Sequence, residues 1–192
     1  MTTDSVAPAP TPAQAETPEP FFFWEHPGRS NPRYSADLAA LRRGVGREAG
    51  SVPEMWEFYR MLTAEGRASE KLQAEHTTLT LYAIHQQSIS IPMHLPSVGL
   101  GKALLKLRQS GKFSADAVDR RFNAAATATS LGEASYHLRG LIRQLRGLPQ
   151  GLDYTRFFQD LVAWQDPDQI STVRRRWGRD YFIGRDQAEK TS

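Results

Sequence analysis

Residues 118–147 read VDRRFNAAATATSLGEASYHLRGLIRQLRG and decide the fold class of this chain. The spacing predicts two amphipathic helices that meet at Ser130, which forms a capping box with Glu133. In the second helix, apolar residues recur at the spacing of one helical face, namely Ala134, Leu138, Leu141 and Leu145. The same period recurs on another face in Arg139, Arg143 and Arg146. One face is therefore predicted to pack into a core, and the other to face anions.

Helix signals of the same kind extend outward from this stretch in both directions. Residues that suit helix starts precede apolar residues at helical spacing. The predicted starts are Ser35, Ser51, Ser69, Ser97, Ser114, Ser130, Asp153 and the Asp166-Pro167 pair. The segment from Ser51 to Glu54 fits a capping box with proline early in the helix. Because no segment alternates polar and apolar residues as a strand does, we expect an all-α helical bundle of about eight helices.

The composition limits the chemistry available to the chain. There is no cysteine, which excludes disulfides and thiolate metal sites. No apolar run approaches the roughly 20 residues that span a bilayer, and the N-terminus does not resemble a secretory signal. We therefore expect a cytoplasmic protein without a membrane partner. Residues 1–20 are predicted to be disordered, whereas the aromatic segment Phe21–Trp24 is predicted to dock on the body of the protein rather than on a partner.

The positive charge is concentrated in one part of the chain. The formal net charge is +3, from 24 basic and 21 acidic side chains. Residues 102–147 carry +6, residues 48–101 carry −3, and residues 1–47 and 148–192 are neutral. With so mild an excess, the position of the charge matters more than its total. Residues 118–147 and the preceding residues 102–117 are therefore the best candidate for an anion-binding surface.

Motifs for catalysis or metal binding are weak. The five histidines show neither HxH nor HxxxH spacing, so we predict no metal site and no cofactor. The neighbouring carboxylates Glu54 and Glu57, and likewise Asp166 and Asp168, sit at predicted helix starts and are better explained as capping residues. The SVGLGK segment at residues 97–102 lacks the GxxxxGK[ST] spacing of a nucleotide-binding loop. Its glycines suit either a phosphate at a helix start or tight packing between helices.

Basic residues at helical spacing are the strongest functional signal. Four predicted helices carry them, and acids are scarce across the last three. The candidate nucleic-acid-binding residues are Arg42, Arg43, Lys102, Lys106, Arg108, Arg120, Arg121, Arg139, Arg143 and Arg146. They are consistent either with solvated helix faces or with a shared groove for a phosphate backbone. Since neither a recognition-helix pattern nor an aromatic RNP-type motif is evident, such binding is predicted to be salt-sensitive and sequence-tolerant.

Several ordered blocks of sequence resemble one known family. They are LAALRRG (38–44), IHQQS (84–88), VGLGKAL (98–104), RRFNAAAT (120–127), YHLRGLIRQLR (136–146), LDYTRFFQDLVAW (152–164) and RRRWGRDYF (174–182). Together they resemble the CasB family, the small subunits of the type I-E Cascade complex in CRISPR immunity, over about residues 35–183. The family's basic positions correspond here to Arg42, Arg43, Lys102, Arg120, Arg121, Arg139 and Arg143.

The resemblance implies a fold and a role. It implies an all-α, two-lobed protein without catalytic activity, present as a pair in the crRNA-guided complex and in contact with its backbone subunits and large subunit. In such complexes the guide pairs with the target strand, and the small subunits help to hold the displaced single-stranded DNA and stabilise the R-loop. We therefore expect residues 1–32 to form a tail with the aromatic segment, 33–112 an N-terminal lobe, 113–183 a C-terminal lobe and 184–192 a frayed end.

Two other functions are consistent with the same residues. One is a structural adaptor whose basic faces meet acidic protein surfaces without touching nucleic acid. The other is a free-standing all-α DNA-binding regulator, which would need a helix built for base readout, and no such helix is found. In the last predicted helix, Arg175, Arg176 and Arg179 are expected to matter less for nucleic-acid binding, because aspartates lie close to them in the sequence.

Overall fold

The computed structural model describes residues 21–26, 31–64 and 67–189, with side chains through residue 183. Within these residues the chain forms seven α-helices and two short 3-10 helices. In chain order they are η1 (Phe23–Glu25), α1 (Tyr34–Arg43), η2 (Pro53–Phe58), α2 (Glu70–Gln86), α3 (Leu100–Gln109), α4 (Ala115–Thr127), α5 (Leu131–Gly147), α6 (Tyr154–Trp164) and α7 (Ile170–Glu189). The all-α prediction is confirmed, and the eight expected helices correspond to α1, η2 and α2 to α7.

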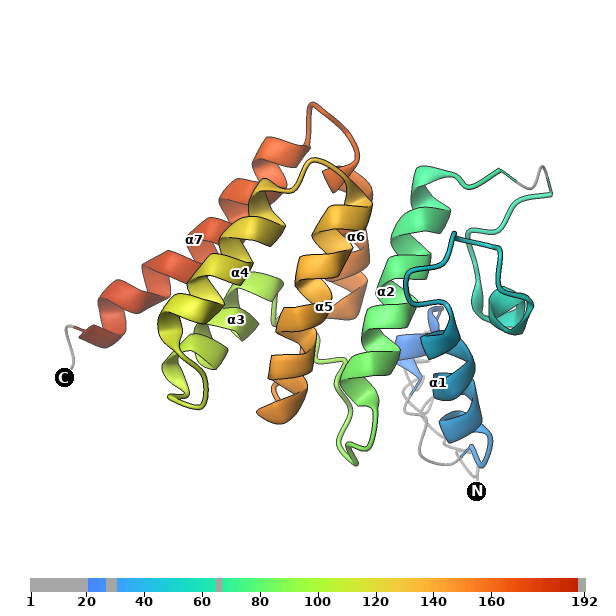
Figure 1. Cartoon of the computed structure of the whole chain (residues 1–192), viewed down its shortest axis with the longest axis horizontal. Coiled ribbons are helices and arrows are strands. Elements are labelled where there is room, and N and C mark those ends of the chain that lie inside the picture. Colours follow the sequence, from blue (N-terminus) through green and yellow to red (C-terminus); the bar gives the residue numbers. More distant parts are fainter. Residues whose placement is uncertain (1–20, 27–30, 65–66, 190–192) are drawn as a thin grey trace, which may run out of the picture.

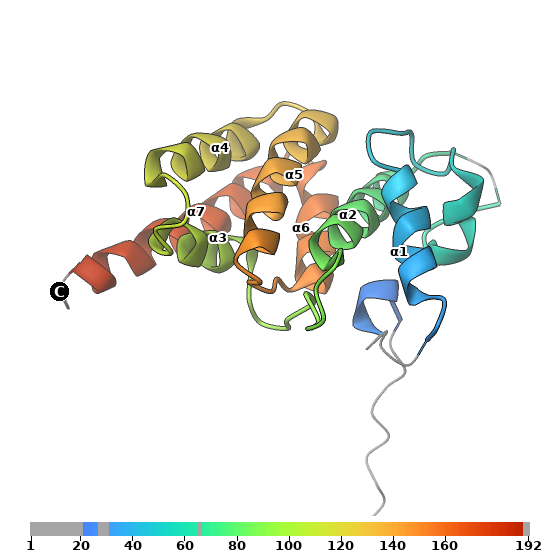
Figure 2. The same cartoon turned by 60° about the horizontal axis from the view of Figure 1, so that its bottom comes forward.

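The helices are arranged in two layers (Figure 1). In the front layer α4, α5, α2 and α1 lie side by side in that order, each packed on the next. Behind them α7 packs on α3, and α6 packs on both α7 and α2, as Figure 2 shows from another side. Among the described helices, none combines the length and hydrophobicity that crossing a bilayer demands. The arrangement leaves α2 enclosed by α1, α5 and α6.

The central helix α2 is buried on all sides although its sequence is partly polar. From Ala74 onward every residue is buried. Glu75 accepts the backbone N–H groups of Arg60 (2.8 Å) and Met61 (2.9 Å). The Gln86 amide accepts one N–H from the loop that follows α2 and donates to two of its carbonyls. Because buried polar groups require hydrogen-bond partners, these side chains fix the loops that surround α2.

Three of the predicted helix starts carry a side-chain cap. Ser69, Ser130 and Asp153 each accept the backbone N–H three residues later, at the starts of α2, α5 and α6. The capping box predicted at Ser130 is only half formed. The Glu133 carboxylate accepts hydrogen bonds from the N–H and hydroxyl of Thr129 instead of from the N–H of Ser130.

Three of the predicted caps are wrong. Ser35 lies inside α1, whose N-cap is Arg33. The Ser51 hydroxyl donates to the Glu48 carbonyl at 2.7 Å, and the segment after it forms only the 3-10 helix η2. The N-cap of α3 is Gly99 rather than Ser97. Ser97 has a φ of 70°, outside the extended conformation of an N-cap, and its N–H donates to Asp153 at 2.8 Å. Local signals therefore located these three elements but misassigned the residues that begin them.

The quoted stretch folds as α4 and α5 with the predicted inward faces. The buried side chains are Val118, Phe122 and Ala125 in α4, and Ala134, Leu138, Leu141, Ile142 and Leu145 in α5. Burying one large aliphatic or aromatic side chain contributes about 1.5–3 kcal/mol, so these two stripes hold the hairpin against α2 and α3. The outward side of the hairpin is left to polar and charged residues.

The aromatic segment at residues 21–24 docks on the body of the protein, as predicted. Trp24 is 1% exposed, and its indole N–H donates to the Thr155 hydroxyl of α6 at 3.0 Å. Phe21, at the start of the segment, is left exposed. The disorder predicted for residues 1–20 lies outside the described residues.

The predicted boundary between two lobes falls between α3 and α4. α3 lies on the N-terminal side of that boundary, yet it packs mainly on α7, which lies on the other side. The division into lobes at residue 112 stays a prediction. The end predicted to fray from residue 184 instead continues as helix to Glu189, and residues 190–192 lie outside the described part.

The stability of the fold should fall as the pH drops below about 6.5, because α2 buries a neutral histidine. His85 is fully buried, with its Nδ1 2.8 Å from the Tyr154 hydroxyl oxygen. Burial lowers the pKa of His85 from its ordinary value of 6.5 to about 3, and the positive charge of Arg146 also lowers it. The stabilising contribution is complete above pH 6.5 and is lost between pH 6.5 and about 3, where only the unfolded chain binds the proton.

Urea unfolding at pH 7 and pH 5 measures this contribution. Between these two values the buried imidazole should remove about 2 kcal/mol from the free energy of unfolding. The variant His85→Gln, which cannot titrate there, should show a loss smaller by that amount. Other titrating groups are present in both proteins, so their effects cancel in the comparison. An identical pH dependence in the two proteins would contradict the assignment to His85.

Candidate nucleic-acid interface

The hairpin of α4 and α5 presents arginines on its outward side. Because each helix buries its apolar stripe, the charged residues between the stripes are turned away from the core. Arg120, Arg121 and Arg143 are exposed, and Arg139 is half-buried. In the part of the chain that the structure describes, none of the four forms an ion pair with an acid. Their charge is therefore available to an external anion.

Two contacts organise this surface. The aliphatic part of Arg121 crosses from α4 to α5 at Gly140, where a Cβ would lie 3.6 Å from Arg121 Cδ. The guanidinium carbon of Arg139 lies 5.5 Å from the ring centroid of Tyr136, within the range of a cation–π contact. Tyr136 was not among the predicted site residues. Its spacing of three residues from Arg139, which places both on one helical face, was the signal available in the sequence.

Arg42 and Arg146 extend the basic surface across α2 toward α1. Both are half-buried, and Arg146 donates to the Gln87 side-chain carbonyl at 3.0 Å. Burial lowers the pKa of Arg42, and the positive charge of Arg146 lowers it further. Guanidinium groups from α1 and α5 therefore lie close enough to repel each other. An anion bound between them would relieve that repulsion.

Two of the predicted arginines have acidic partners. The Arg108 Nε of α3 lies 3.0 Å from an Asp119 carboxylate oxygen of α4, so its charge is used in the interface between these helices. Arg43 lies 3.2 Å from Glu54, and both side chains are largely exposed. An exposed pair of this kind is worth little, about 0–1 kcal/mol, so a phosphate can compete for Arg43 more easily than for Arg108.

The lysines of α3 are separate from the arginines of the hairpin. Lys102 and Lys106 are exposed. Their helix packs on α4, α5 and α7 through its buried face, which turns both lysines away from the α4–α5 hairpin. Figure 1 shows α3 behind α4. The structure therefore does not join them to the hairpin arginines in one continuous row.

The glycines of the SVGLGK segment serve helix packing. A Cβ at Gly101 would lie 2.4 Å from the Trp177 carbonyl oxygen of α7. At the N-cap of the same helix, a Cβ at Gly99 would lie 3.5 Å from the Arg156 guanidinium and 3.6 Å from a carboxylate oxygen of Asp180. These two side chains form an ion pair at 3.9 Å, so the charges beside this helix start already compensate each other.

The arginines of α7 pair with aspartates, in part as predicted. Arg179 donates to Asp180 at 2.9 Å, the sequence neighbour that the prediction used. Arg176 instead forms its ion pair with Asp160 of α6, which is buried. Arg175 is exposed and donates to a threonine of its own helix. Two of the three charges are therefore engaged within the protein.

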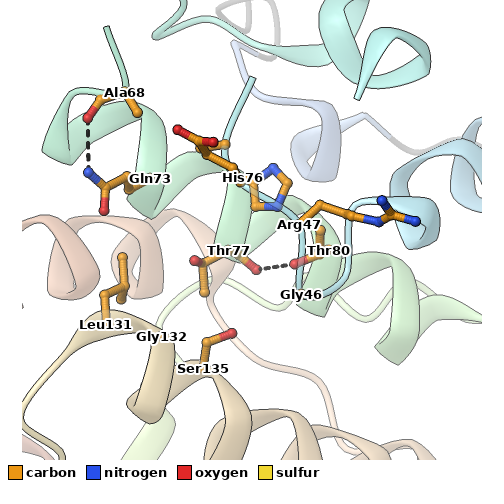
Figure 3. A pocket seen from close by; sticks show the side chains of 12 residues that line it. Gly46, Arg47, Ala68, Gln73, His76, Thr77, Thr80, Leu131, Gly132 and Ser135 are labelled. Atoms are coloured by element: carbon orange, nitrogen blue, oxygen red, sulfur yellow. Dashed lines mark hydrogen bonds between the residues drawn. The ribbon is translucent and has the colours of Figure 1, made fainter. Parts of the chain in front are cut away.

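A polar hollow of about 360 Å³ opens between the loop after α1, the helix α2 and the first turn of α5 (Figure 3). The polar and charged side chains that line it are Arg47, Glu48, Gln73, His76, Thr77, Thr80 and Ser135. Both ring nitrogens of His76 are engaged, Nδ1 at 2.6 Å from the Tyr59 hydroxyl and Nε2 at 2.9 Å from the Gly44 carbonyl. Burial also lowers the pKa of His76. This histidine is therefore not placed to act as a general base in the hollow.

A second hollow, between η1, α6 and α7, also contains titratable side chains. Its carboxylates serve the fold: Asp153 caps α6, Asp160 accepts the indole N–H of Trp177, and Glu25 accepts the hydroxyl of Thr155. Among the described residues, no group of three or more histidines or acids is placed to hold a metal ion. The ring of His76 and the carboxylates of Asp153, Asp160 and Glu25 are therefore engaged within the fold.

The fold and the surface together define a class, namely an all-α protein of two helical layers whose α4–α5 hairpin carries arginines without acidic partners among the described residues. Within that class, the chain belongs to the CRISPR-associated Cse2 family, whose sequence model matches residues 37–182. This match confirms the resemblance to CasB that the sequence blocks indicated.

Individual relatives agree with the family assignment. The CRISPR-associated protein Cse2 of Thermus thermophilus is 26% identical over 174 residues, which cover 90% of this chain and 94% of the relative. The crystal structure of CasB from Thermobifida fusca is 31% identical, with a TM-score of 0.63 over 79% of this chain and 86% of that one. A chain of a solved CRISPR RNA-guided surveillance complex shares the fold at 23% identity, with a TM-score of 0.61 over 81% of this chain and 86% of that one.

Proposed function

We propose that this protein is the small subunit of a type I-E Cascade complex and that the arginines of its α4–α5 hairpin hold the displaced DNA strand. The observation that carries the proposal is the set Arg120, Arg121, Arg139 and Arg143, which lack acidic partners among the described residues. Phosphates neutralise such side chains with release of counterions. Holding the displaced strand stabilises the R-loop, because a held strand does not re-pair with the target.

The partners follow from the family. Membership of the Cse2 family, and the fold shared with a chain of a surveillance complex, support assembly with crRNA-containing subunits. On this proposal the protein contacts the large subunit, the backbone subunits and a second copy of itself. On this proposal it contributes no catalytic step, in line with His76, Asp153 and Asp160 being engaged in the fold.

The salt dependence of binding tests the proposal directly. The full chain is titrated with single-stranded DNA, duplex DNA and single-stranded RNA across a salt series. We expect affinity to fall steeply with salt and to depend little on sequence. The variant Arg139→Ala plus Arg143→Ala should lower the slope of log affinity against log salt by about 1.4 on single strands, which is about tenfold in affinity at physiological salt.

A matched variant removes the same charge elsewhere. Arg175→Ala plus Arg179→Ala deletes two arginines from the outer flank of α7 and should leave both affinity and slope nearly unchanged. Equal losses from the two double variants would mean that net charge, and not the hairpin, decides binding. A wild-type protein that binds none of the three nucleic acids at low salt would refute the proposal and favour the adaptor, whose arginines meet acidic proteins.

A further inference from the structure

Tyr136 stands out on the hairpin because its aromatic ring is exposed in the middle of a basic surface. It is 66% exposed, the most exposed of the large apolar side chains in the part of the chain that the structure describes. A single exposed aromatic residue needs no special explanation in general. The surroundings of this ring are what distinguish it.

Two neighbouring side chains restrict the ring. The Arg139 guanidinium carbon lies over it at 5.5 Å from the centroid, and the His137 ring meets it edge to face, with centroids 5.3 Å apart. These contacts restrict the side chain without burying it. A ring that is already restricted loses less entropy when a ligand stacks on it than a freely rotating one does.

The neighbouring turns of α5 leave space beside the ring. Gly132 and Gly140 lie four residues before and after Tyr136, at the positions that would otherwise place side chains against it. A Cβ at Gly132 would meet only Ser130 Oγ, at 3.9 Å. At Gly140 the adjacent space is bordered by the side chain of Arg121. The ring is therefore open toward the start of α5 and flanked by a guanidinium toward its end.

This combination suits an unpaired nucleobase better than a protein side chain. Bases of a single strand stack on exposed aromatic rings, and every base has a π-face, so the contact tolerates any sequence. Arg139 and Arg143 lie three and seven residues after Tyr136 on α5, and Arg121 of α4 borders Gly140, one turn from the ring. These arginines supply the charge that the adjoining phosphates require. The nearest acid on α5, Glu133, is engaged with Thr129.

We propose that Tyr136 is a stacking platform for an unpaired nucleobase of the strand that the hairpin arginines hold. The inference rests on the proposed function and adds to it a contact that is aromatic rather than ionic. In duplex DNA the bases are already stacked on one another. The platform therefore gives the hairpin a preference for single strands that the arginines alone do not provide.

Stacking and charge neutralisation differ in their response to salt, and the test uses this difference. Tyr136→Ala should weaken binding of a single-stranded DNA oligonucleotide by about five- to one-hundredfold and leave the slope against log salt unchanged. Tyr136→Phe should bind as wild type, and duplex DNA should be bound equally by all three proteins. An oligonucleotide of abasic sites, which has phosphates but no bases, should not distinguish Tyr136→Ala from wild type. The same series with single-stranded RNA shows whether the base comes from DNA, from RNA or from either.

Control variants distinguish the stacking role of Tyr136 from nucleic-acid binding by the hairpin arginines. Phe21→Ala removes another exposed aromatic side chain, outside the hairpin, and should not alter binding. Thermal unfolding of Tyr136→Ala should match wild type, since the ring is largely exposed. If wild type binds single strands but Tyr136→Ala binds them equally well, the platform is refuted and the arginine surface stands. If Tyr136→Ala lowers the salt slope, the residue acts by positioning Arg139 and stacking is likewise refuted. Absence of any binding by wild type refutes both proposals.

Discussion

Replacing Asp160 with alanine should cost about 3 kcal/mol of the free energy of unfolding, the largest loss we expect from a single polar side chain. Asp160 is 2% exposed and joins α6 to α7. It accepts the indole N–H of Trp177 at 2.5 Å and pairs with the guanidinium of Arg176. The Ala variant would leave the buried Trp177 N–H without an acceptor. The Arg176 side chain is 29% exposed and can recover part of its solvation, so the estimate lies at the lower end for a broken buried pair.

The substitution Asp160→Asn separates the hydrogen bonds from the charge. Burial raises the pKa of Asp160 despite the opposing effects of Trp177 and Arg176, which indicates that the ionised form gains little from its partners overall. An amide keeps an oxygen acceptor for the indole, so Asn should cost only about 1 kcal/mol. Urea unfolding at neutral pH measures both variants. Equal losses from Ala and Asn would show that the negative charge, and not the acceptor, holds α6 and α7 together.

The sequence was sufficient to predict the helices whose apolar residues follow one face. In α5 the stripe from Ala134 to Leu145 is local information, and the structure buries all of it. The central position of α2 was not predictable in this way, because its buried face includes polar residues. Glu75 is satisfied by backbone groups fifteen and fourteen residues away, and the Nδ1 of His85 by Tyr154, sixty-nine residues away. Only the tertiary fold supplies those partners.

The candidate site was predictable to a similar extent. The period of the charges placed arginines on the outer side of the α4–α5 hairpin, and the structure leaves them without acidic partners among the described residues. Ion pairs across helices, such as Arg108 with Asp119, decide which charges remain available. The mutual repulsion of Arg42 and Arg146, which come from α1 and α5, also affects which charges remain available to an anion. These relations depend on which helices become neighbours, and a helical period cannot specify that.

Gly101 shows how tertiary packing resolves an ambiguity of the sequence, and replacing it should have a large effect on stability. A Cβ at this position would lie 2.4 Å from the Trp177 carbonyl oxygen, 2.8 Å from Asp180 Cβ and 3.0 Å from the Tyr181 backbone nitrogen. Two of these atoms belong to the backbone of α7 and cannot move aside as a flexible side chain would. Gly101→Ala should therefore push α3 away from α7 and destabilise the protein by about 2 kcal/mol, even though alanine favours helix more than glycine does.

Gly178 on α7 is the matched control, because a Cβ there meets nothing within 4 Å. Gly178→Ala gains helix propensity without a steric cost and should stabilise the protein by about 0.5–1 kcal/mol. The same glycine-to-alanine change should thus lower stability on α3 and raise it on α7, two helices that pack together. In urea unfolding, the free energies of unfolding of the two variants should differ by about 3 kcal/mol. If instead Gly101→Ala left stability unchanged but weakened binding of a phosphate-bearing ligand, the glycine would serve a site at the start of α3. In that case the packing explanation would be wrong, and Lys102, the next residue along, would become the place to look for the phosphate.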